Sequence, residues 1–258
     1  MNWYPQVGTG SIAQLPVTRT RKWRAITNSL ESGEEVMLPD TTAGQIDWKL
    51  TYQDLGSAEA QSLSSLFTAS RGQFAPFGFV DPLANLLGWS EALSQSCWQA
   101  GLLQLNAGIT DPLGTQRASS LANPNTAAQM LQQTVAIPGN YVACFSAYLW
   151  SAVVGTVTLE RDRTQATVNV GPFWTRAYVS GQGGSGTAQS TFSIVLATGQ
   201  LIGVWGLQVE TQPYPSAYKQ TEVPLGIYQE TYFAGDELTT TSTAPGLSSC
   251  EIALISRV

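Results

Sequence analysis

The 258-residue sequence contains no histidine and only three cysteines, and these absences exclude several kinds of chemistry. Without histidine there is no Ser-His-Asp or Cys-His nucleophile, and a common zinc ligand is missing. Cys97, Cys144 and Cys250 stand far apart and form no CxxC pair. We interpret them as free buried thiols, with a disulfide between two of them as the open alternative. No cofactor is expected.

Long apolar runs and positive charge are also missing. No run approaches the roughly 18 residues of a membrane-spanning helix. The first residues, MNWYPQVG, lack the basic and apolar regions of a signal peptide. The net charge is −6 and the pI is about 4.6, which argues against nucleic acid as the main partner. We expect synthesis in a cytoplasm and no membrane insertion.

The first third of the sequence predicts strands followed by one helix. Apolar and polar residues alternate strictly from Ile46 to Tyr52, which is typical of a strand with one buried face. Ser57 is a candidate N-cap for a helix that ends near Ser70. Gly72 lies where a left-handed residue commonly ends a helix.

Four basic residues are concentrated just before this strand, in the stretch RTRKWRAI. They are Arg19, Arg21, Lys22 and Arg24. In a strand they would place charge on both faces. Such charge is typical of a solvated edge strand, where it discourages pairing between molecules. It also suits a strand that contacts the acidic surface of a neighbouring subunit, and the sequence does not choose between the two.

Residues 20 to 85 carry an ordered set of motifs: a W-x-L-x-Y strand, a short helix, Arg-Gly, aromatic residues and Asp-Pro. The matching residues are Trp48, Leu50, Tyr52, Leu66, Phe67, Arg71, Gly72, Phe74, Phe77, Phe79, Asp81 and Pro82. This order resembles the β-barrel domain of distal tail proteins and related tail-hub proteins of siphophages. The resemblance implies a ring-forming structural protein.

A second set of motifs covers residues 95 to 221. It comprises the turn DPLGTQRASS from Asp111, the strand YVACFSAYLW from Tyr141, Trp174 with Arg176, and a closing strand, Leu201 to Glu210. The closing motif continues through Pro215, Tyr218 and Thr221. The set resembles jelly-roll, carbohydrate-binding-like modules of phage tail and fibre proteins. Strict alternation in the closing strand predicts Trp205, Leu207 and Val209 on one face, with Gly206, Gln208 and Glu210 on the other.

The 37 residues after Thr221 are too few for a core of their own. They end in the alternating strand CEIALISRV, which must pair elsewhere, and the N-terminal region is the expected partner. The predicted fold is therefore mostly β. It consists of a discontinuous tail-hub β-barrel with one short helix, residues 1–92 with 222–258, and an inserted β-sandwich, or jelly roll, at 93–221.

Sugar sites in such modules stack pyranose rings on aromatic side chains. The candidates are Trp150, Tyr148, Trp174 and Tyr178, with Trp150 the best placed because it ends a strand beside a turn. The alternative is that most of these aromatics belong to the core. The resemblance also allows a structural calcium ion near Asp111. Asp162 and Glu210 are available carboxylates, but nothing in the sequence places two of them across a cleft, so no enzyme is expected.

By resemblance, the chain is a structural subunit of a bacteriophage tail tip. The barrel would form a ring, expected to be a hexamer, between the tail-tube protein and the tail hub proteins. The jelly roll would point outward and contact host-cell glycans, placing the protein in the virion. One alternative is a receptor-binding or fibre protein whose jelly roll binds host polysaccharide. A polysaccharide depolymerase is the least favoured.

Overall fold

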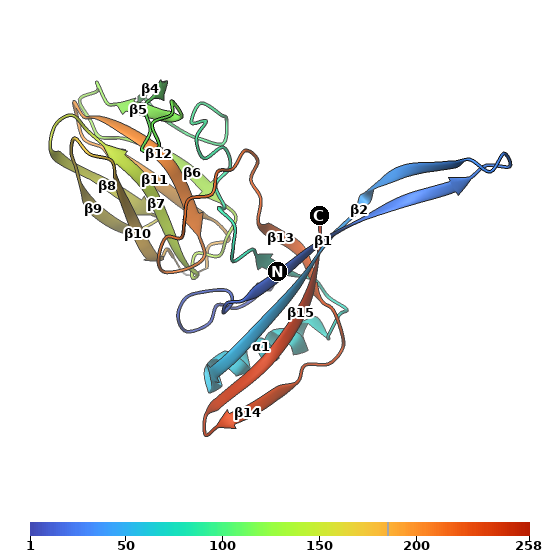
Figure 1. The fold of residues 1–258 in the computed structure, drawn as a ribbon. Helices are drawn as coiled ribbons and strands as arrows, with labels where there is room; N and C mark the ends of the chain where they lie inside the picture. Colours follow the sequence, from blue (N-terminus) through green and yellow to red (C-terminus); the bar gives the residue numbers. More distant parts are fainter. Residues whose placement is uncertain (185) are drawn as a thin grey trace. The chain divides into compact units, whose positions relative to one another are not determined.

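We analysed a computed structural model that describes residues 1–184 and 186–258, with side chains left out at 41–43 (Figure 1). The chain divides into two compact units. The first, here the sheet unit, contains Met1–Gly8, Ile12–Val80 and Tyr228–Val258. The second, the sandwich unit, contains Thr9–Ser11 and Asp81–Ile227. Among the described residues, no helix is both long and apolar enough to cross a bilayer.

The sheet unit is built on one antiparallel sheet. Its strands run in the order β1 (Val17–Ser29), β2 (Glu35–Gly56), β15 (Leu247–Arg257), β13 (Ile227–Phe233) and β3 (Phe77–Val80), with β14 (Thr240–Ala244) pairing β15. The predicted pairing of the last strand with the N-terminal region is confirmed, because β15 pairs with β2 along its length. The Thr-rich segment before β15, which the sequence predicts as a turn, contains β14 instead.

The sheet is open rather than a closed barrel within the described residues, since β1 and β3 are its two ends. Closure is not needed to bury its inner face, because α1 (Ser57–Ser70) supplies apolar cover: Leu63 and Leu66 are buried. The ring of Phe67 packs edge-on against Phe233, with centroids 5.0 Å apart. The predicted mostly β class with one helix and a sandwich is confirmed. The prediction of a barrel is wrong in one respect, because the sheet is open.

The structure can be compared with the predicted alternation of the strand before the helix and with the predicted ends of the helix. Ile46, Trp48, Leu50 and Tyr52 are all buried on one face of β2. Gly56, rather than Ser57, is the N-cap, and its amide donates to Glu59 Oε2 at 2.6 Å. The helix ends where predicted, with Gly72 in the left-handed region at φ 61°.

The sandwich unit has two antiparallel sheets. The five-stranded sheet runs β10 (Thr175–Gln182), β7 (Val142–Trp150), β12 (Leu201–Glu210), β5 (Ala118–Ala122) and β4 (Gln104–Ile109). The four-stranded sheet runs β6 (Gln129–Val135), β11 (Ser190–Leu196), β8 (Gly155–Arg161) and β9 (Thr164–Val170). Phe145 meets Phe192 across the core, with centroids 5.9 Å apart. From the sequence, strands are predicted at 141–150, 156–160, 167–170, 172–178, 191–196 and 201–210, which correspond to β7 through β12, whereas β4, β5 and β6 are not predicted.

Buried polar side chains fix the ends of this unit. Asn85 is buried; its amide donates to the carbonyls of Leu207 and Lys219, and its oxygen accepts from Val209 N. These bonds attach residues 81–92 to the sandwich, whereas the sequence placed that segment with the N-terminal domain. Residues 222–227 also cluster with the sandwich.

Arg161 is the largest buried charge in the sandwich unit, with no exposed surface. Its guanidinium donates to the carbonyls of Tyr141, Gly181 and Gly139 and to Ser190 Oγ. Burial lowers the pKa of Arg161 to about 10, which leaves it cationic at neutral pH. One side chain therefore joins residues 139–141 to the strands β10 and β11.

All three cysteines are free. Cys144 and Cys250 are buried, as predicted, while Cys97 is partly exposed. Burial and the nearby Glu210 carboxylate raise the pKa of Cys144 to about 12, so this thiol is unreactive at neutral pH.

Candidate functional site

The outward face of the five-stranded sheet carries the predicted aromatic residues. Along β7, Tyr148 and Trp150 point away from the core, while Phe145 and Leu149 are buried. Tyr148 lies opposite Trp205 of β12, and Trp150 lies opposite Gly203. The space above Gly203 is filled by the Trp174 ring, because a Cβ at this glycine would lie only 2.9 Å from it.

A bulge in β12 overturns the predicted alternation of this strand. Trp205 opposes Tyr148, but Gln208, rather than Leu207, opposes Ser146. Gly206 makes the extra residue possible because it adopts φ 63°, a left-handed conformation that glycine tolerates best. The bulge brings Gln208 and Glu210 onto the same face as Trp205.

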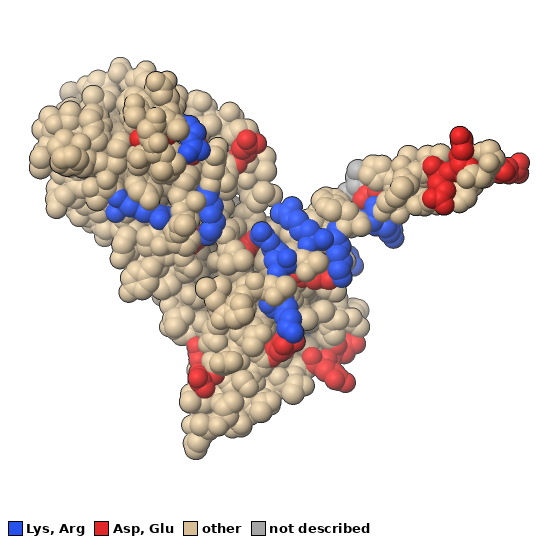
Figure 2. All heavy atoms as spheres, viewed as in Figure 1, with Lys and Arg blue, Asp and Glu red and all other residues tan. Residues whose placement is uncertain are grey.

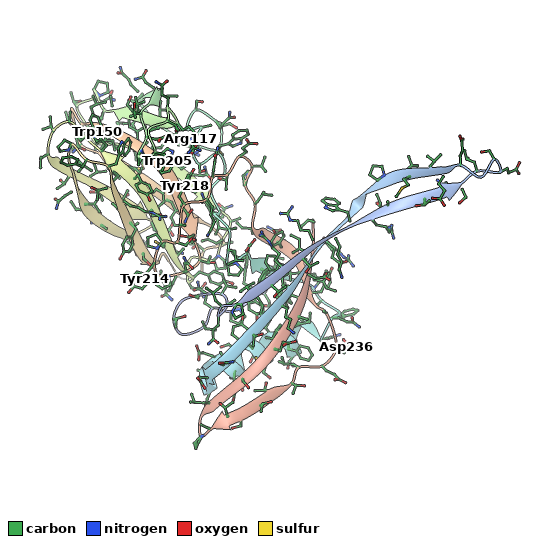
Figure 3. The ribbon with its side chains drawn as sticks, in the orientation of Figure 1. Arg117, Trp150, Trp205, Tyr214, Tyr218 and Asp236 are labelled. Atoms are coloured by element: carbon green, nitrogen blue, oxygen red, sulfur yellow. The ribbon has the colours of Figure 1, made fainter. Side chains whose placement is uncertain are left out.

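Trp150 and Trp174 line one cavity at one end of this face (Figure 3 labels Trp150). Their ring centroids are 6.4 Å apart and tilted by 36°. The cavity holds about 710 Å³, within the range of ~300–1,000 Å³ usual for ligand clefts. Its other lining residues are mostly apolar and include Ile109, Pro112, Leu201 and Ile202, with polar atoms from Thr110, Asp111 and Ser120. Two of the four predicted sugar-binding residues thus share one site.

The other two predicted residues lie on the same face but outside the cavity. Tyr148 packs on Trp205 at 5.1 Å and lies under the guanidinium of Arg176 at 5.4 Å. Tyr178 is 41% exposed and meets Tyr214 edge-on at 6.3 Å. Figure 3 shows Tyr214 at the opposite end of the sandwich from Trp150. Tyr148 is therefore a supporting residue, and Tyr178 belongs to a separate aromatic pair.

A segment that we call the strap, Ser216–Thr221, covers the middle of the face. Tyr218 packs on Trp205 at 4.8 Å, and its hydroxyl bonds to Ser90 Oγ at 2.8 Å. Because the strap occupies this part of the sheet, the Trp150–Trp174 cavity is not continuous with a groove along the whole face.

Glu210 anchors the strap from beneath and is only 1% exposed. It accepts from Ser216 N at 2.9 Å and from Lys219 Nζ at 2.9 Å. Burial acts to raise the pKa of Glu210, but bonds from Ser216, Lys219 and Gln208 outweigh it and lower the pKa. An ionised, fully engaged carboxylate is a structural group and is unsuited to act as a general acid.

Arg117 links the strap to the rest of the face, and sequence reasoning missed it. Its guanidinium donates to Gln220 Oε1 at 3.0 Å, lies 3.4 Å from Glu91 Oε1 and stacks over Trp205 at 5.6 Å. The only sequence signal was its place in the DPLGTQRASS turn. Its partners come from three distant segments, so only the fold brings them together.

Asp111 is used within that turn. Its carboxylate accepts from the amides of Leu113, Thr115 and Arg117 and from the Thr115 hydroxyl. Burial acts to raise the pKa of Asp111, and these bonds lower it further than burial raises it. A calcium ligand needs oxygens that are free of such donors. The residues around Asp111 therefore do not fit a calcium ion.

The predicted interface residues lie on β1, which is an edge strand of the sheet unit. Arg19 stacks on Trp48 at 5.8 Å. Lys22 pairs with Asp47, and Arg24 pairs with Asp40, across the ladder to β2. Arg21 is exposed. The edge-strand interpretation is confirmed, and contact with a neighbouring subunit stays a prediction.

Beyond Arg24, β1 and β2 continue as a two-stranded ribbon that we call the arm, residues 24–40 (Figure 1). Its exposed apolar residues are Ile26, Leu30, Val36, Met37 and Leu38, each 41% to 67% exposed. Ile26 lies opposite Leu38, and Met37 opposite Thr27, so the two pairs face opposite sides. Both faces of the arm therefore present apolar side chains to solvent.

Comparisons with known proteins leave the family open. No family model matches the chain, and no curated protein matches it. A solved structure of the CBM22-1 xylan-binding domain from Paenibacillus barcinonensis Xyn10C is 14% identical; the match covers 52% of this chain and 99% of that one, with TM-score 0.42. The C-terminal family 22 carbohydrate-binding module of Clostridium thermocellum Xyn10B is 19% identical, covering 49% and 92%, with TM-score 0.39.

A third solved structure is the enzymatically active domain of bacteriophage CBA120 tailspike protein 4. It is 14% identical, with TM-score 0.37. The match covers 51% of this chain but only 22% of the tailspike chain. At TM-scores below 0.5, none of these similarities carries an argument about function, which therefore rests on the side chains described above.

Proposed function

We propose that this protein is a structural subunit of a bacteriophage tail tip, assembled as a ring between the tail-tube protein and the tail hub proteins. The observation that carries the proposal is the arm. An isolated two-stranded ribbon is at best marginally stable in water, and this one exposes apolar residues on both faces. Packing against neighbouring subunits would bury these faces and hold the ribbon in one conformation.

A ring suits this arrangement because the arm and its binding surface are different parts of the chain. Such head-to-tail contacts repeat from subunit to subunit and generate a closed ring when the rotation between subunits closes. The expected copy number is six, which follows only from the resemblance to distal tail proteins.

The test is the mass and symmetry of the full chain by native mass spectrometry and negative-stain class averages. The matched variant replaces residues 25–39 by Asn-Gly, which closes the ladder at the Arg24–Asp40 pair with a two-residue turn. We expect rings from the full chain, and a folded monomer with unchanged thermal unfolding of the sandwich unit from the variant. Rings of the same size from both proteins would contradict the proposal.

A second function is supported by the Trp150–Trp174 cavity: weak binding of a host-surface glycan by the sandwich unit. Two tilted indole rings beside hydroxyl groups suit the apolar face of a pyranose. Repetition around a ring would turn weak contacts into useful avidity. The strap covers the middle of the face next to this cavity, which favours a terminal sugar over the interior of a long chain.

Glycan binding is tested with host lipopolysaccharide and capsule fragments by calorimetry. Trp150→Ala should weaken binding about tenfold, as expected for the loss of one aromatic contact. Phe173→Ala is the matched control, because Phe173 is 80% exposed, adjoins Trp174 and does not line the cavity. Equal losses in both variants would remove the cavity from the proposal.

The alternative of a receptor-binding or fibre protein differs in its interface. A trimer formed through the sandwich unit, with an unused arm, would favour that alternative. Release of reducing ends from the same glycans would favour a depolymerase.

A further inference from the structure

The arm ends in an acidic tip. Residues 26–38 include Glu31, Glu34 and Glu35 and no lysine or arginine. All three glutamates are exposed, and none forms an ion pair within the described part of the chain. Figure 2 shows the negative charge gathered at the far end of the arm, away from the positive charge over its base. Leu30, beside them in the turn, is 48% exposed.

A hollow of about 760 Å³ lies elsewhere in the sheet unit, beside β13 and β15. Arg71 and Arg257 contribute positive charge to its lining, and Tyr232 and Phe74 contribute aromatic surface. The Arg257 guanidinium lies over Tyr232 at 4.9 Å, and Phe74 is 76% exposed.

The two arginines of the hollow are available to a partner. Asp236, the only carboxylate of its lining, accepts from the backbone and the side-chain amide of Gln73. Neither Arg71 nor Arg257 forms an ion pair within the described residues. Nearer the arm, Lys22 pairs with Asp47, Arg24 with Asp40 and Lys49 with Glu251. Arg21 is exposed there, but it is a single charge and does not line the hollow.

We propose that the acidic tip of the arm, Glu31 to Glu35, binds the Arg71–Arg257 hollow of a second copy of this chain. Charge complementarity selects the partner, because the tip is purely acidic and the hollow holds two unpaired guanidinium groups. Leu30 would contact the exposed ring of Phe74. The contact rests on the proposed function, since it defines which surfaces meet in the ring.

Arm length is compatible with a contact between copies. A strand rises about 3.3 Å per residue, so the part of β1 that belongs to the arm, residues 24–29, reaches about 20 Å. Tip and hollow are different surfaces, so the contact is head-to-tail and can repeat around a ring.

The experiment is a charge reversal and rescue on the full chain, with assembly followed by mass photometry over a range of protein concentrations. The first variant carries Glu31→Lys, Glu34→Lys and Glu35→Lys, and the second carries Arg71→Glu and Arg257→Glu. Each variant should raise about tenfold the protein concentration at which half of the chains are assembled. Single exposed ion pairs are weak, but each variant reverses several charges of the same contact. A single chain that carries all five substitutions should restore assembly close to that of the original protein.

Arg163→Glu is the matched control, since it reverses an exposed charge outside the hollow and outside the predicted interface residues of β1. A photo-crosslinking residue at Leu30 gives a second readout. It should form a crosslink to the peptide containing Gln73 and Phe74, between copies distinguished by isotope labelling.

The outcomes separate this proposal from the proposed function. Rings that require the arm but ignore both sets of reversals, with the Leu30 crosslink elsewhere, overturn the tip contact and leave the proposed function standing. A full chain that is monomeric at every concentration overturns both.

Discussion

The arm exposes apolar side chains to solvent, whereas the sandwich unit buries charged ones. The arm exposes apolar residues such as Met37, which is 67% exposed, on a ribbon only two strands wide. The sandwich unit buries charge: Arg161 and Glu210 are at most 1% exposed and are hydrogen-bonded within the unit. Buried charged groups whose hydrogen-bond partners lie within the same unit mark a structure that needs no neighbour to hold them. Apolar residues left in solvent mark one that a neighbour completes.

The largest effect should come from removing the buried charge of the sandwich. Arg161→Ala leaves the carbonyls of Tyr141 and Gly181 without donors in the interior. We expect a loss of about 3–5 kcal/mol in the free energy of unfolding of the sandwich unit, measured by urea titration. Arg163→Ala, at an exposed neighbouring turn residue, is the control and should change it by less than about 0.5 kcal/mol. A loss below about 1 kcal/mol for Arg161→Ala would show that the sandwich does not depend on this network.

Glu210 makes the same region sensitive to acid. Its bonds to Ser216 and Lys219 lower its pKa below the ordinary value of 4.5, against the effect of burial. A carboxyl whose folded pKa is lowered contributes stability that is present above pH 4.5 and lost as the pH falls through the folded pKa. Glu210→Gln should cost about 2–3 kcal/mol at pH 7.

The pH profile distinguishes this role from simple packing. Between pH 5 and 3 the stability of Glu210→Gln should fall less steeply than that of the original chain, with a residual slope from Asp111, whose pKa is also lowered. Glu222→Gln, at an exposed position, should leave the slope unchanged. Parallel profiles for Glu210→Gln and the original chain would contradict the assigned role.

Gly206 tests whether the bulge positions the strap. Alanine there must adopt φ 63°, and its methyl group would come within 3.1 Å of Tyr148 and 3.4 Å of Tyr218. We expect a loss of about 1–2 kcal/mol, with a weaker near-ultraviolet circular dichroism signal from the Trp205–Tyr218 pair. Gly155→Ala is the matched control, because nothing lies within 4 Å of its methyl position. A normal spectrum for Gly206→Ala would mean that the strap does not need the bulge.

How far the sequence could predict these features depends on how local they are. The alternation in Ile46–Tyr52 and the terminal strand follow from period-two patterns, and both predictions are confirmed. Gly206 did not reveal a bulge, because a glycine within an alternating strand is compatible with either geometry, and only the pairing with β7 decides. The role of Arg117 could not be predicted, because its partners Gln220, Glu91 and Trp205 all lie far from it in the sequence.

The candidate sites also combine local features, which the sequence shows, with tertiary contacts, which it does not. Its place at the end of a strand beside a turn made Trp150 the best sugar-binding candidate, but its contact with Trp174 depends on how β7 and β10 pair. The arm was visible in the sequence only as β-forming residues followed by the acidic turn ESGEE. Exposure of apolar residues on both its faces is a tertiary property, because it depends on where the rest of the sheet ends.

The smallest effect on stability should come from the arm, where the effect on assembly should be largest. Replacing Ile26, Met37 and Leu38 by threonine keeps residues that favour strands and removes exposed apolar surface. Because little of that surface is buried within the chain, the free energy of unfolding should change by less than about 0.5 kcal/mol. Native mass spectrometry should show monomers, whereas Leu225→Thr, at an exposed apolar site outside the arm, should still form rings. A destabilised monomer would mean that the arm packs within its own chain, and the contrast between the two regions would fail.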